Sequence, residues 1–285
     1  MAVRPAGRAS TRRLLTATPL SREHEQFVLQ GRQHSRKQIA FDQFERKRYP
    51  KAAVALALDA VSALARGEYV AVHQFALVSS ALALNGAPFD VITAAARVPA
   101  DEIRHADLAS RMARRLAGED VEFEIPRGEL EREFANARDQ ESLDVLMVQL
   151  PAISETLAYA LLSACRDRAS DPTLKALYAT IVADELHHAR LGWYYLAWRA
   201  PQWTQAERQR VADRCGGMIA GVERQFWRGR DAVSTVREAA RALGVLDSEG
   251  QRAAVRQVME DEIVPGLDAI GLGASHAWRA RGRGR

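Results

Sequence analysis

Two stretches of the chain, DEIRH at residues 101–105 and DELHH at residues 184–188, repeat one pattern of Asp, Glu, two further positions and His. Positions three apart lie on one face of an α-helix, so the Glu and the His of each stretch would point in the same direction. A carboxylate beside an imidazole suits divalent metal ions. A single pair of this kind arises easily by chance on a solvated helix, whereas a repeated pair with the same preceding Asp does not. The repeat therefore predicts a metal site.

Each repeated stretch has a lone glutamate upstream. Glu68 stands 34 residues before Glu102, and Glu155 stands 30 residues before Glu185. If each pair lies on two antiparallel helices joined by a short turn, the chain climbs one helix and descends the next at 1.5 Å per residue, so the two partners return to a similar height. The spacing predicts two half-sites that meet at the centre of a helical bundle.

The four glutamates also lie in apolar stripes. Around Glu68, the positions one and two turns away on the same face are Val61, Leu64, Val72 and Phe75. Four buried carboxylates without compensation would cost several kcal/mol each, or would have to be protonated. Two ions of iron or manganese would supply the compensation, because oxygen and imidazole ligands suit these metals better than thiolate-seeking ones.

The rest of the chain beyond residue 50 has the apolar period of α-helices and no alternating strand pattern. Four long helices are expected at about 50–84, 89–117, 138–169 and 172–199. Two of the links between them are short and the middle one, residues 118–137, is long, which is the connectivity of a four-helix bundle made of two antiparallel pairs. Further helices are expected at about 204–228, 231–243 and 248–263, with breaks at Gly244 and Pro265.

The charge is distributed unevenly along the chain. Residues 1–50 carry eleven Lys and Arg against four Asp and Glu, and residues 276–285 carry four Arg; since the whole chain is +4, the body is −7. An acidic body makes nucleic acid an unexpected partner. The expected organisation is a basic, partly flexible N-terminal arm (1–49), a ferritin-like di-metal bundle (50–200, on the resemblance given below), C-terminal helices packed on it (201–270) and a basic flexible tail (271–285).

Composition excludes several classes of protein. The chain is 47% apolar and 27% charged, as in ordinary globular proteins. Cys165 and Cys215 stand far apart, which excludes a disulfide framework and a thiolate metal site. The longest apolar-rich stretch, residues 52–65, contains Asp59 and is shorter than the ~20 residues of a bilayer-spanning helix, so no membrane span is expected. No secretory signal is evident, and the expected location is the cytoplasm.

The repeated pattern resembles the ferritin-like di-iron carboxylate superfamily, whose bundles take a Glu from each of two helices and Glu-x-x-His from each of the other two. The resemblance covers about residues 60–195. It implies an all-α, ferritin-like four-helix bundle with additional C-terminal helices and a cofactor of two iron ions, or manganese. The ligands it implies are Glu68, Glu102, His105, Glu155, Glu185 and His188.

The same resemblance implies roles within this set. Glu102 and Glu185 are expected to bridge the two metals. An aspartate before the ligand Glu often accepts the second N–H of the histidine across the site in such proteins, so Asp101 is expected to pair with His188 and Asp184 with His105. Such a bond fixes the tautomer of the imidazole.

The resemblance also implies a reaction with O₂. Rubrerythrin-like peroxidases are disfavoured because the chain has no C-x-x-C pair, and storage ferritins because 86 residues follow Arg199. The ribonucleotide reductase small subunit is larger. Arylamine N-oxygenases are similar in the double Glu-x(about 30)-Asp-Glu-x-x-His spacing, but this sequence has Ile181 where they carry a third histidine. Aldehyde-deformylating oxygenases and aliphatic or tRNA hydroxylases use six ligands and stay open.

The expected function is that of a non-haem di-iron oxygenase or oxidase that oxidises a small organic substrate. Its partners would be O₂, the substrate and an electron donor, the last two unidentified, and a homodimer stays open. Two alternatives stay open as well: a ferroxidase or iron-handling protein, and a metal-binding helical interaction module without catalysis. His73, His187, Tyr159 and Tyr178 are expected to serve packing, surface or supporting roles rather than metal ligation.

Overall fold

The structure, a computed structural model, describes residues 39–123, 139–226 and 234–281. All regular elements in these ranges are helices, which confirms the all-helical prediction. In chain order they are η1 (Phe41–Gln43), η2 (Arg46–Arg48), α2 (Lys51–Leu84), α3 (Phe89–Ala117), α5 (Gln140–Met147), η3 (Val148–Ser154), α6 (Glu155–Arg168), α7 (Pro172–Arg199), η4 (Ala200–Gln202), α8 (Gln205–Phe226), α9 (Ser234–Ala242), α10 (Ser248–Val258), η5 (Met259–Ile263), α11 (Val264–Ala269) and α12 (Ala274–Ala280). Most of the expected N-terminal arm and long crossover lies outside the described residues.

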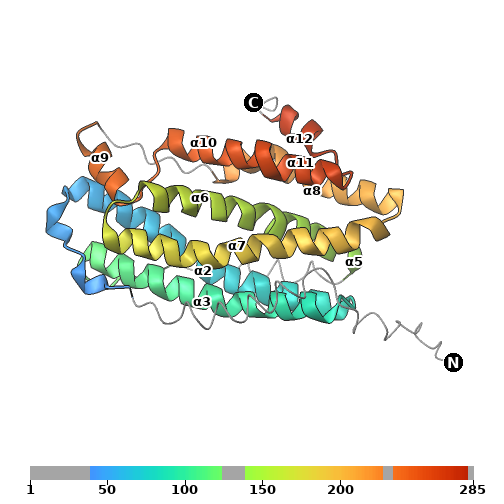
Figure 1. The fold of residues 1–285 in the computed structure, drawn as a ribbon, viewed down its shortest axis with the longest axis horizontal. Coiled ribbons are helices and arrows are strands. Elements are labelled where there is room, and N and C mark those ends of the chain that lie inside the picture. Colours follow the sequence, from blue (N-terminus) through green and yellow to red (C-terminus); the bar gives the residue numbers. More distant parts are fainter. Residues whose placement is uncertain (1–38, 124–138, 227–233, 282–285) are drawn as a thin grey trace.

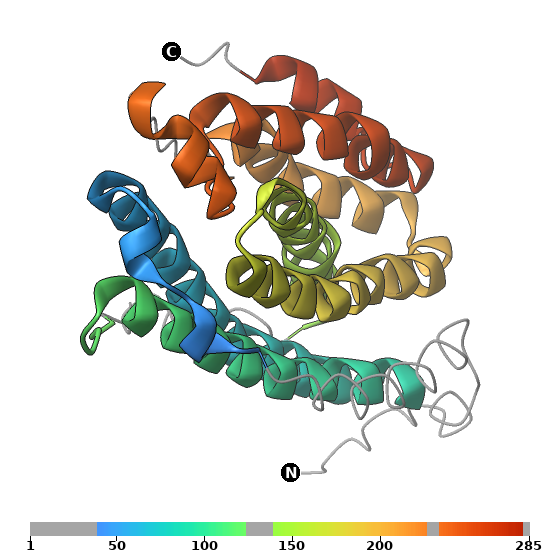
Figure 2. The same cartoon turned by 60° about the vertical axis from the view of Figure 1, so that its left-hand side comes forward.

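Four long helical segments form the body of the protein (Figure 1). Helices α2 and α3 form one antiparallel hairpin, and the continuous segment α5–η3–α6 forms a second one with α7. Helix α3 packs on α7, and α5 contacts α2. Figure 2 shows the α2–α3 hairpin on one side, α6 and α7 in the middle, and α8 and α10–α12 on the far side. The bounds of the four segments agree closely with the sequence prediction.

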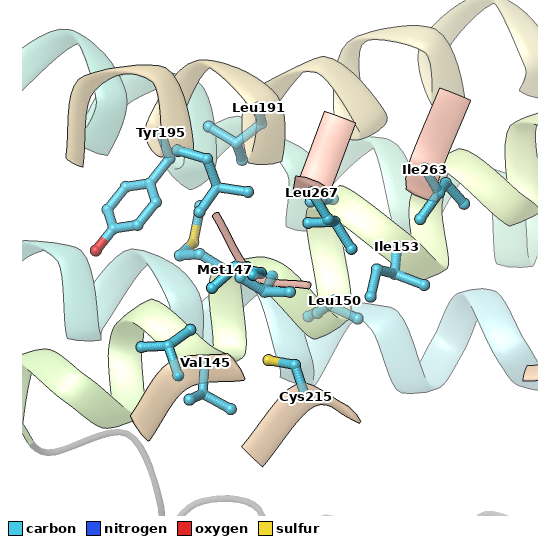
Figure 3. Packing of buried hydrophobic residues seen from close by; sticks show 14 of the residues in the cluster. Val145, Met147, Leu150, Ile153, Leu191, Tyr195, Cys215, Ile263 and Leu267 are labelled. Carbon is cyan, nitrogen blue, oxygen red and sulfur yellow. The ribbon is translucent and has the colours of Figure 1, made fainter. Parts of the chain in front are cut away.

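The apolar core consists of two clusters. One joins the first half of α2, the second half of α3 and the first half of α7. The other joins the opposite halves of these helices to α5–η3–α6 and the C-terminal helices; in Figure 3, Met147 and Leu150 lie in it together with Leu191 and Tyr195 of α7. On α2, for example, Ala65 belongs to the first cluster and Phe75 to the second, with Glu68 between them. A polar layer therefore separates the two halves of the core.

Turns and caps follow the residues that the sequence marks as breaks. Gly86, Gly118 and Gly244 all have positive φ, at 66°, 80° and 79°, a conformation that favours glycine. At the start of α7, the Asp171 carboxylate accepts hydrogen bonds from the backbone N–H of Thr173 and Leu174, which caps the helix. The predicted break at Gly244 and the two links between paired helices are thus confirmed.

Two local expectations are wrong. Pro265 does not end the last predicted helix, since the π-helical segment η5 precedes it and places it in the first turn of α11, where its missing N–H costs nothing. Residues 271–281 are not part of a flexible tail, because α12 folds back and buries Trp278, with the Arg281 guanidinium 3.8 Å from its ring centroid. The helix through Pro265 and the packing of α12 both depend on tertiary contacts, which the local sequence pattern does not reveal.

One helical segment of the described chain, Gln140–Arg168, is long and apolar enough to cross a membrane by length and composition. The sequence prediction missed it by naming residues 52–65 as the longest apolar stretch. The most apolar 18-residue stretch of this segment is 61% buried inside the protein. The segment also carries the buried carboxylates of Asp144 and Glu155. The core helix of a soluble protein has these properties.

Helix α7 approaches the π-helical segment η3 very closely at Gly192. A Cβ atom at this position would lie 2.3 Å from the backbone nitrogen of Ala152 and 2.6 Å from the carbonyl carbon of Pro151. Only a residue without a side chain allows this spacing. Since Glu155 immediately follows η3, the close approach sets how near that glutamate comes to α7.

Gly192→Ala is expected to destabilise the fold by about 1–3 kcal/mol, because backbone and not a flexible side chain must move to admit the methyl group. Chemical denaturation followed by circular dichroism measures the change. Gly217→Ala on α8 is the matched control: no atom lies within 4 Å of its Cβ position, so the substitution should be neutral or stabilise the helix by up to about 1 kcal/mol. Equal effects of the two substitutions would contradict the close approach.

Candidate metal centre

The structure brings the six predicted ligands together in the polar layer of the bundle. Helix α2 contributes Glu68, α3 contributes Glu102 and His105, α6 contributes Glu155, and α7 contributes Glu185 and His188. They form two overlapping groups: Glu68, Glu102, His105 and Glu185, and Glu102, Glu155, Glu185 and His188. Within each group the candidate ligand atoms all lie within 4.8 Å of one another, and every member is buried. Two of the glutamates belong to both groups, and each group has one histidine of its own.

The two imidazoles present the same ring nitrogen to the cluster. His105 Nδ1 lies 3.2 Å from Glu185 Oε1 and 3.5 Å from Glu68 Oε2. His188 Nδ1 lies 3.0 Å from Glu102 Oε1 and 3.4 Å from Glu185 Oε2. The rings are 5.8 Å apart between centroids. The arrangement is close to two-fold symmetric, as the repeated sequence pattern suggests.

The other nitrogen of each ring faces an aspartate of the opposite motif. His105 Nε2 lies 3.0 Å from Asp184 Oδ2, within hydrogen-bond range, and His188 Nε2 lies 3.7 Å from Asp101 Oδ2. The first is the pairing expected from the sequence; in the second the expected partners face each other, but His188 Nε2 makes no hydrogen bond within the described chain. An N–H donated to an aspartate from Nε2 leaves the Nδ1 lone pair facing the carboxylates, which is the tautomer a metal ligand needs.

Arg104 is a site residue that the sequence interpretation missed. Its Nη2 atom makes an ion pair with Asp184 and lies 3.4 Å from Asp101 Oδ1, so one guanidinium joins the two aspartates. Hydrogen bonds and ion pairs thus run from His105 through Asp184 and Arg104 to Asp101, which lies 3.7 Å from His188 Nε2. The signal was present within the quoted DEIRH stretch, because Arg104 stands three positions after Asp101 and lies on the same helix face.

Glu155 reaches the cluster from an irregular part of its helix. It is the first residue after the π-helical segment η3, which contains Pro151. In η3 the Ser154 hydroxyl donates to the carbonyl of Gln149, five residues earlier, at 2.9 Å. A single π-helical turn shifts the helix face that follows it, and such turns are frequent at functional sites.

The buried atoms of the cluster have unmet bonding capacity. Both carboxylate oxygens of Glu102 and of Glu185, and the Nδ1 atoms of both histidines, are buried and make no hydrogen bond within the described chain. Their contacts with one another are not aligned as hydrogen bonds. Unsatisfied buried carboxylates are costly, and coordination to a cation satisfies them. The residues present therefore fit a metal ion.

The two outer glutamates resist ionisation. Burial, with repulsion from Glu102 and Glu185, raises the pKa of Glu68 well above its usual value. Burial and the same two neighbours raise the pKa of Glu155 in the same way. Each of these two glutamates therefore keeps its proton to higher pH than an ordinary carboxyl group does.

The shared glutamates have a lowered pKa and the two histidines a raised pKa, so both kinds of residue favour their charged form. Burial acts to raise the pKa of Glu185, but His188 and His105 outweigh it and hold this pKa below its usual value. Burial acts to lower the pKa of His105, but Asp184 and the glutamates raise it well above the usual range. The pKa of His188 is likewise raised against burial by Glu185 and Glu102. Both histidines therefore favour the protonated form more than a free imidazole does, next to shared glutamates that favour the ionised form.

The two weaker histidine candidates, His73 and His187, belong to neither group of candidate ligands, and the two tyrosines pack in apolar surroundings. Tyr178 is buried in an apolar cluster, where its ring lies against Gly244. Burial and the neighbouring His188 lower the pKa of His187. Tyr159 packs at the edge of the same apolar cluster as Tyr178. His73 is half-buried on α2, beyond the ligand face.

Comparison of the chain with protein-family models, with curated proteins and with solved structures gives no match in any of the three. The class of the site is therefore defined by its own geometry. It is a buried centre of glutamates and histidines, built from four helices, that could hold metal.

Arg104→Gln is expected to lower the affinity for Mn²⁺ by about 10–100-fold while the helical content stays unchanged, because both aspartates lose the charge that positions them. Equilibrium titration of the metal-free protein measures the change. Arg115→Gln is the control, since Arg115 lies exposed on the same helix away from the cluster. An Arg104→Gln protein that binds Mn²⁺ like its parent would show that the bridge has no role in metal binding.

Metal binding is expected to release protons, because four groups with raised pKa, Glu68, Glu155, His105 and His188, must become unprotonated to act as ligands. Affinity should therefore rise with pH and fall on acidification. Calorimetric titration of Mn²⁺ at neutral pH, in buffers of different ionisation enthalpy, should show about one or more protons released per ion. A binding enthalpy that does not depend on the buffer would contradict this.

Proposed function

We propose that this protein is a ferritin-like, non-haem di-iron oxidoreductase that uses O₂ to oxidise a small organic substrate. The observation that carries the proposal is the pair of overlapping ligand groups, which share Glu102 and Glu185 and have one histidine each. A site for one metal ion needs only one such group, so two groups that share two carboxylates support a site for two ions.

Charge supports two divalent ions. Four glutamates with two neutral imidazoles carry a charge of −4 in a buried site, and two divalent cations neutralise it. The donor set is oxygen and imidazole without sulfur, which suits iron or manganese. When bound, two irons supply the electrons for reduction of O₂, and the chemistry is that of the cofactor.

The residues of the chain would then have distinct roles. Glu102 and Glu185 would contact both ions, while His105 and His188 would bind one each. Asp184 and Asp101 would face the imidazoles as acceptors for their Nε2–H groups, and Arg104, which pairs with both aspartates, would hold them in position. The apolar clusters on either side exclude bulk water from the layer.

The surroundings bear on the substrate. Ile181, which takes the place of a third histidine of the arylamine N-oxygenases, is fully buried one turn before Glu185, so the chain offers six ligands and not seven. Phe75 packs beside His188, with ring centroids 6.0 Å apart. Apolar neighbours favour an uncharged organic substrate, such as an aldehyde or an aliphatic chain, over an ionic one.

Anaerobic loading with Fe²⁺ followed by exposure to O₂ tests the proposal. The parent should bind about two irons per chain, and Glu102→Ala or Glu185→Ala should abolish binding of the pair, because each removes a ligand common to both groups. O₂ uptake supported by an electron donor should then increase with one class among amines, aldehydes and fatty acids. His187→Ala, next to a ligand but outside both groups, is the control and should load like the parent.

The other outcomes point to the two alternatives. Continued turnover of added Fe²⁺, indifferent to every organic compound, would replace the proposal with an iron-handling protein. Two bound irons that never react with O₂ would leave a metal-stabilised interaction module. Folded protein with no bound iron or manganese would contradict the metal centre itself.

A further inference from the structure

One tryptophan on α7 makes a hydrogen bond beside the polar layer. Trp193 stands five residues after His188, and its indole Nε1–H donates to the Thr156 hydroxyl at 3.0 Å. Thr156 is 1% exposed and directly follows Glu155 on α6. The bond therefore joins α7 to the residue next to a candidate ligand.

The Thr156 hydroxyl makes a second bond, to the irregular segment that precedes it. It donates to the backbone carbonyl of Ala152, at 2.7 Å, within the π-helical segment η3. The backbone of Ala152 also lies nearest to the Cβ position of Gly192, the residue before Trp193. Two consecutive residues of α7 thus hold the same residue of η3, one by close packing and the other through Thr156.

The indole ring of Trp193 packs against α11. A Cβ atom at Gly266 would lie 2.7 Å from Cζ3 and 2.9 Å from Cη2 of this ring, so the glycine leaves the space that the ring occupies. Leu267, the next residue, packs in one apolar cluster with Leu150 of η3 (Figure 3). The C-terminal helices therefore support η3 both directly and through Trp193.

The two groups of candidate ligands differ in this support. Glu68, which belongs only to the group with His105, stands within α2, a continuous α-helix. Glu155, which belongs only to the group with His188, directly follows η3. A regular helix fixes its side chains by its own hydrogen bonds, whereas a π-helical turn is rare and has to be stabilised by its surroundings. The position of Glu155 thus depends on the packing around η3.

We propose that Trp193 is a positioning residue for one half of the metal centre, which it supports through Thr156 and Glu155. The ion bound with His188 should then depend on this contact with the C-terminal helices, and the ion bound with His105 should not. The inference rests on the metal centre of the proposed function, but not on a reaction with O₂. It gives the C-terminal helices a role in a site whose candidate ligands, within the described chain, all come from other helices.

Titration with Mn²⁺ in two single-site backgrounds tests the inference. Glu68→Gln leaves the group with His188 complete, and Glu155→Gln leaves the group with His105 complete. Trp193→Phe removes the N–H donor and keeps an aromatic ring. It should lower the Mn²⁺ affinity by roughly tenfold in the first background, as loss of a group that orients a ligand does, and leave it unchanged in the second. In the otherwise unchanged chain, the same substitution should weaken one of the two binding steps and not both.

Three further variants separate positioning from packing. Thr156→Val keeps the side-chain volume but loses both hydroxyl bonds, and should reproduce the effect of Trp193→Phe in the Glu68→Gln background. Thr156→Ser retains the hydroxyl and should keep the affinity of that background. Trp198→Phe is the matched control, because the ring of Trp198, on the same helix, packs edge-on against Tyr195, and should leave Mn²⁺ binding unchanged in both backgrounds.

Equal loss of affinity in both backgrounds, or in both binding steps, would overturn the inference, because Trp193 would then support the fold as a whole. No loss in either would overturn it too. Circular dichroism shows whether each variant is folded, and the comparison of Thr156→Val with Thr156→Ser decides if Trp193→Phe is not.

The inference and the proposed function can fail separately. Protein that shows the expected difference between the two ions but never reacts with O₂ would contradict the oxidoreductase and leave the role of Trp193 in place. Protein that reacts with O₂ but loses both ions equally on Trp193→Phe would contradict only this inference. A folded parent that binds no metal would contradict both.

Discussion

The burial of four carboxylates in one layer is the constraint on which the rest of the structure depends. Glu68, Glu102, Glu155 and Glu185 lie between two apolar clusters, each glutamate on a different helix. Ionised and uncompensated, such a group would oppose folding by several kcal/mol per charge. Two kinds of compensation suit these residues: a proton, which the raised pKa of Glu68 and of His105 favours, or a cation in its place.

Several irregular features become intelligible from this constraint. The π-helical segment η3 and the glycine at position 192 together bring Glu155 close to α7. The first interrupts the regular α-helix, and the second leaves no room for a side chain at that position. Arg104 supplies a fixed positive charge at the edge of the layer, where Asp101 and Asp184 would otherwise add two more negative charges. A packed apolar core alone would require none of these three features, namely η3, Gly192 and Arg104.

The sequence was sufficient for the features that repeat. Helix bounds followed from apolar period, glycine and proline, and the six clustered residues followed from a motif present twice at matched distances, because both signals are local or depend only on helix rise. Arg104 was missed since its second partner, Asp184, lies 80 positions away in sequence. The helix through Pro265 and the docking of α12 through Trp278 likewise depend on tertiary contacts that outweigh local propensity.

Helix α2 is unusually poor in charged side chains. In 34 residues it has only four charged side chains, Lys51, Asp59, Arg66 and Glu68, and the last of these is buried in the cluster. An amphipathic surface helix normally carries charge on its outer face. From Gly67 onward α2 instead presents a carboxylate inward and an uncharged surface outward, so both sides have the composition of contact surfaces. The inner side is fixed by the two apolar clusters, because Ala65 belongs to one and Phe75 to the other with Glu68 between them, and a centre built from shared ligands requires such fixed positions.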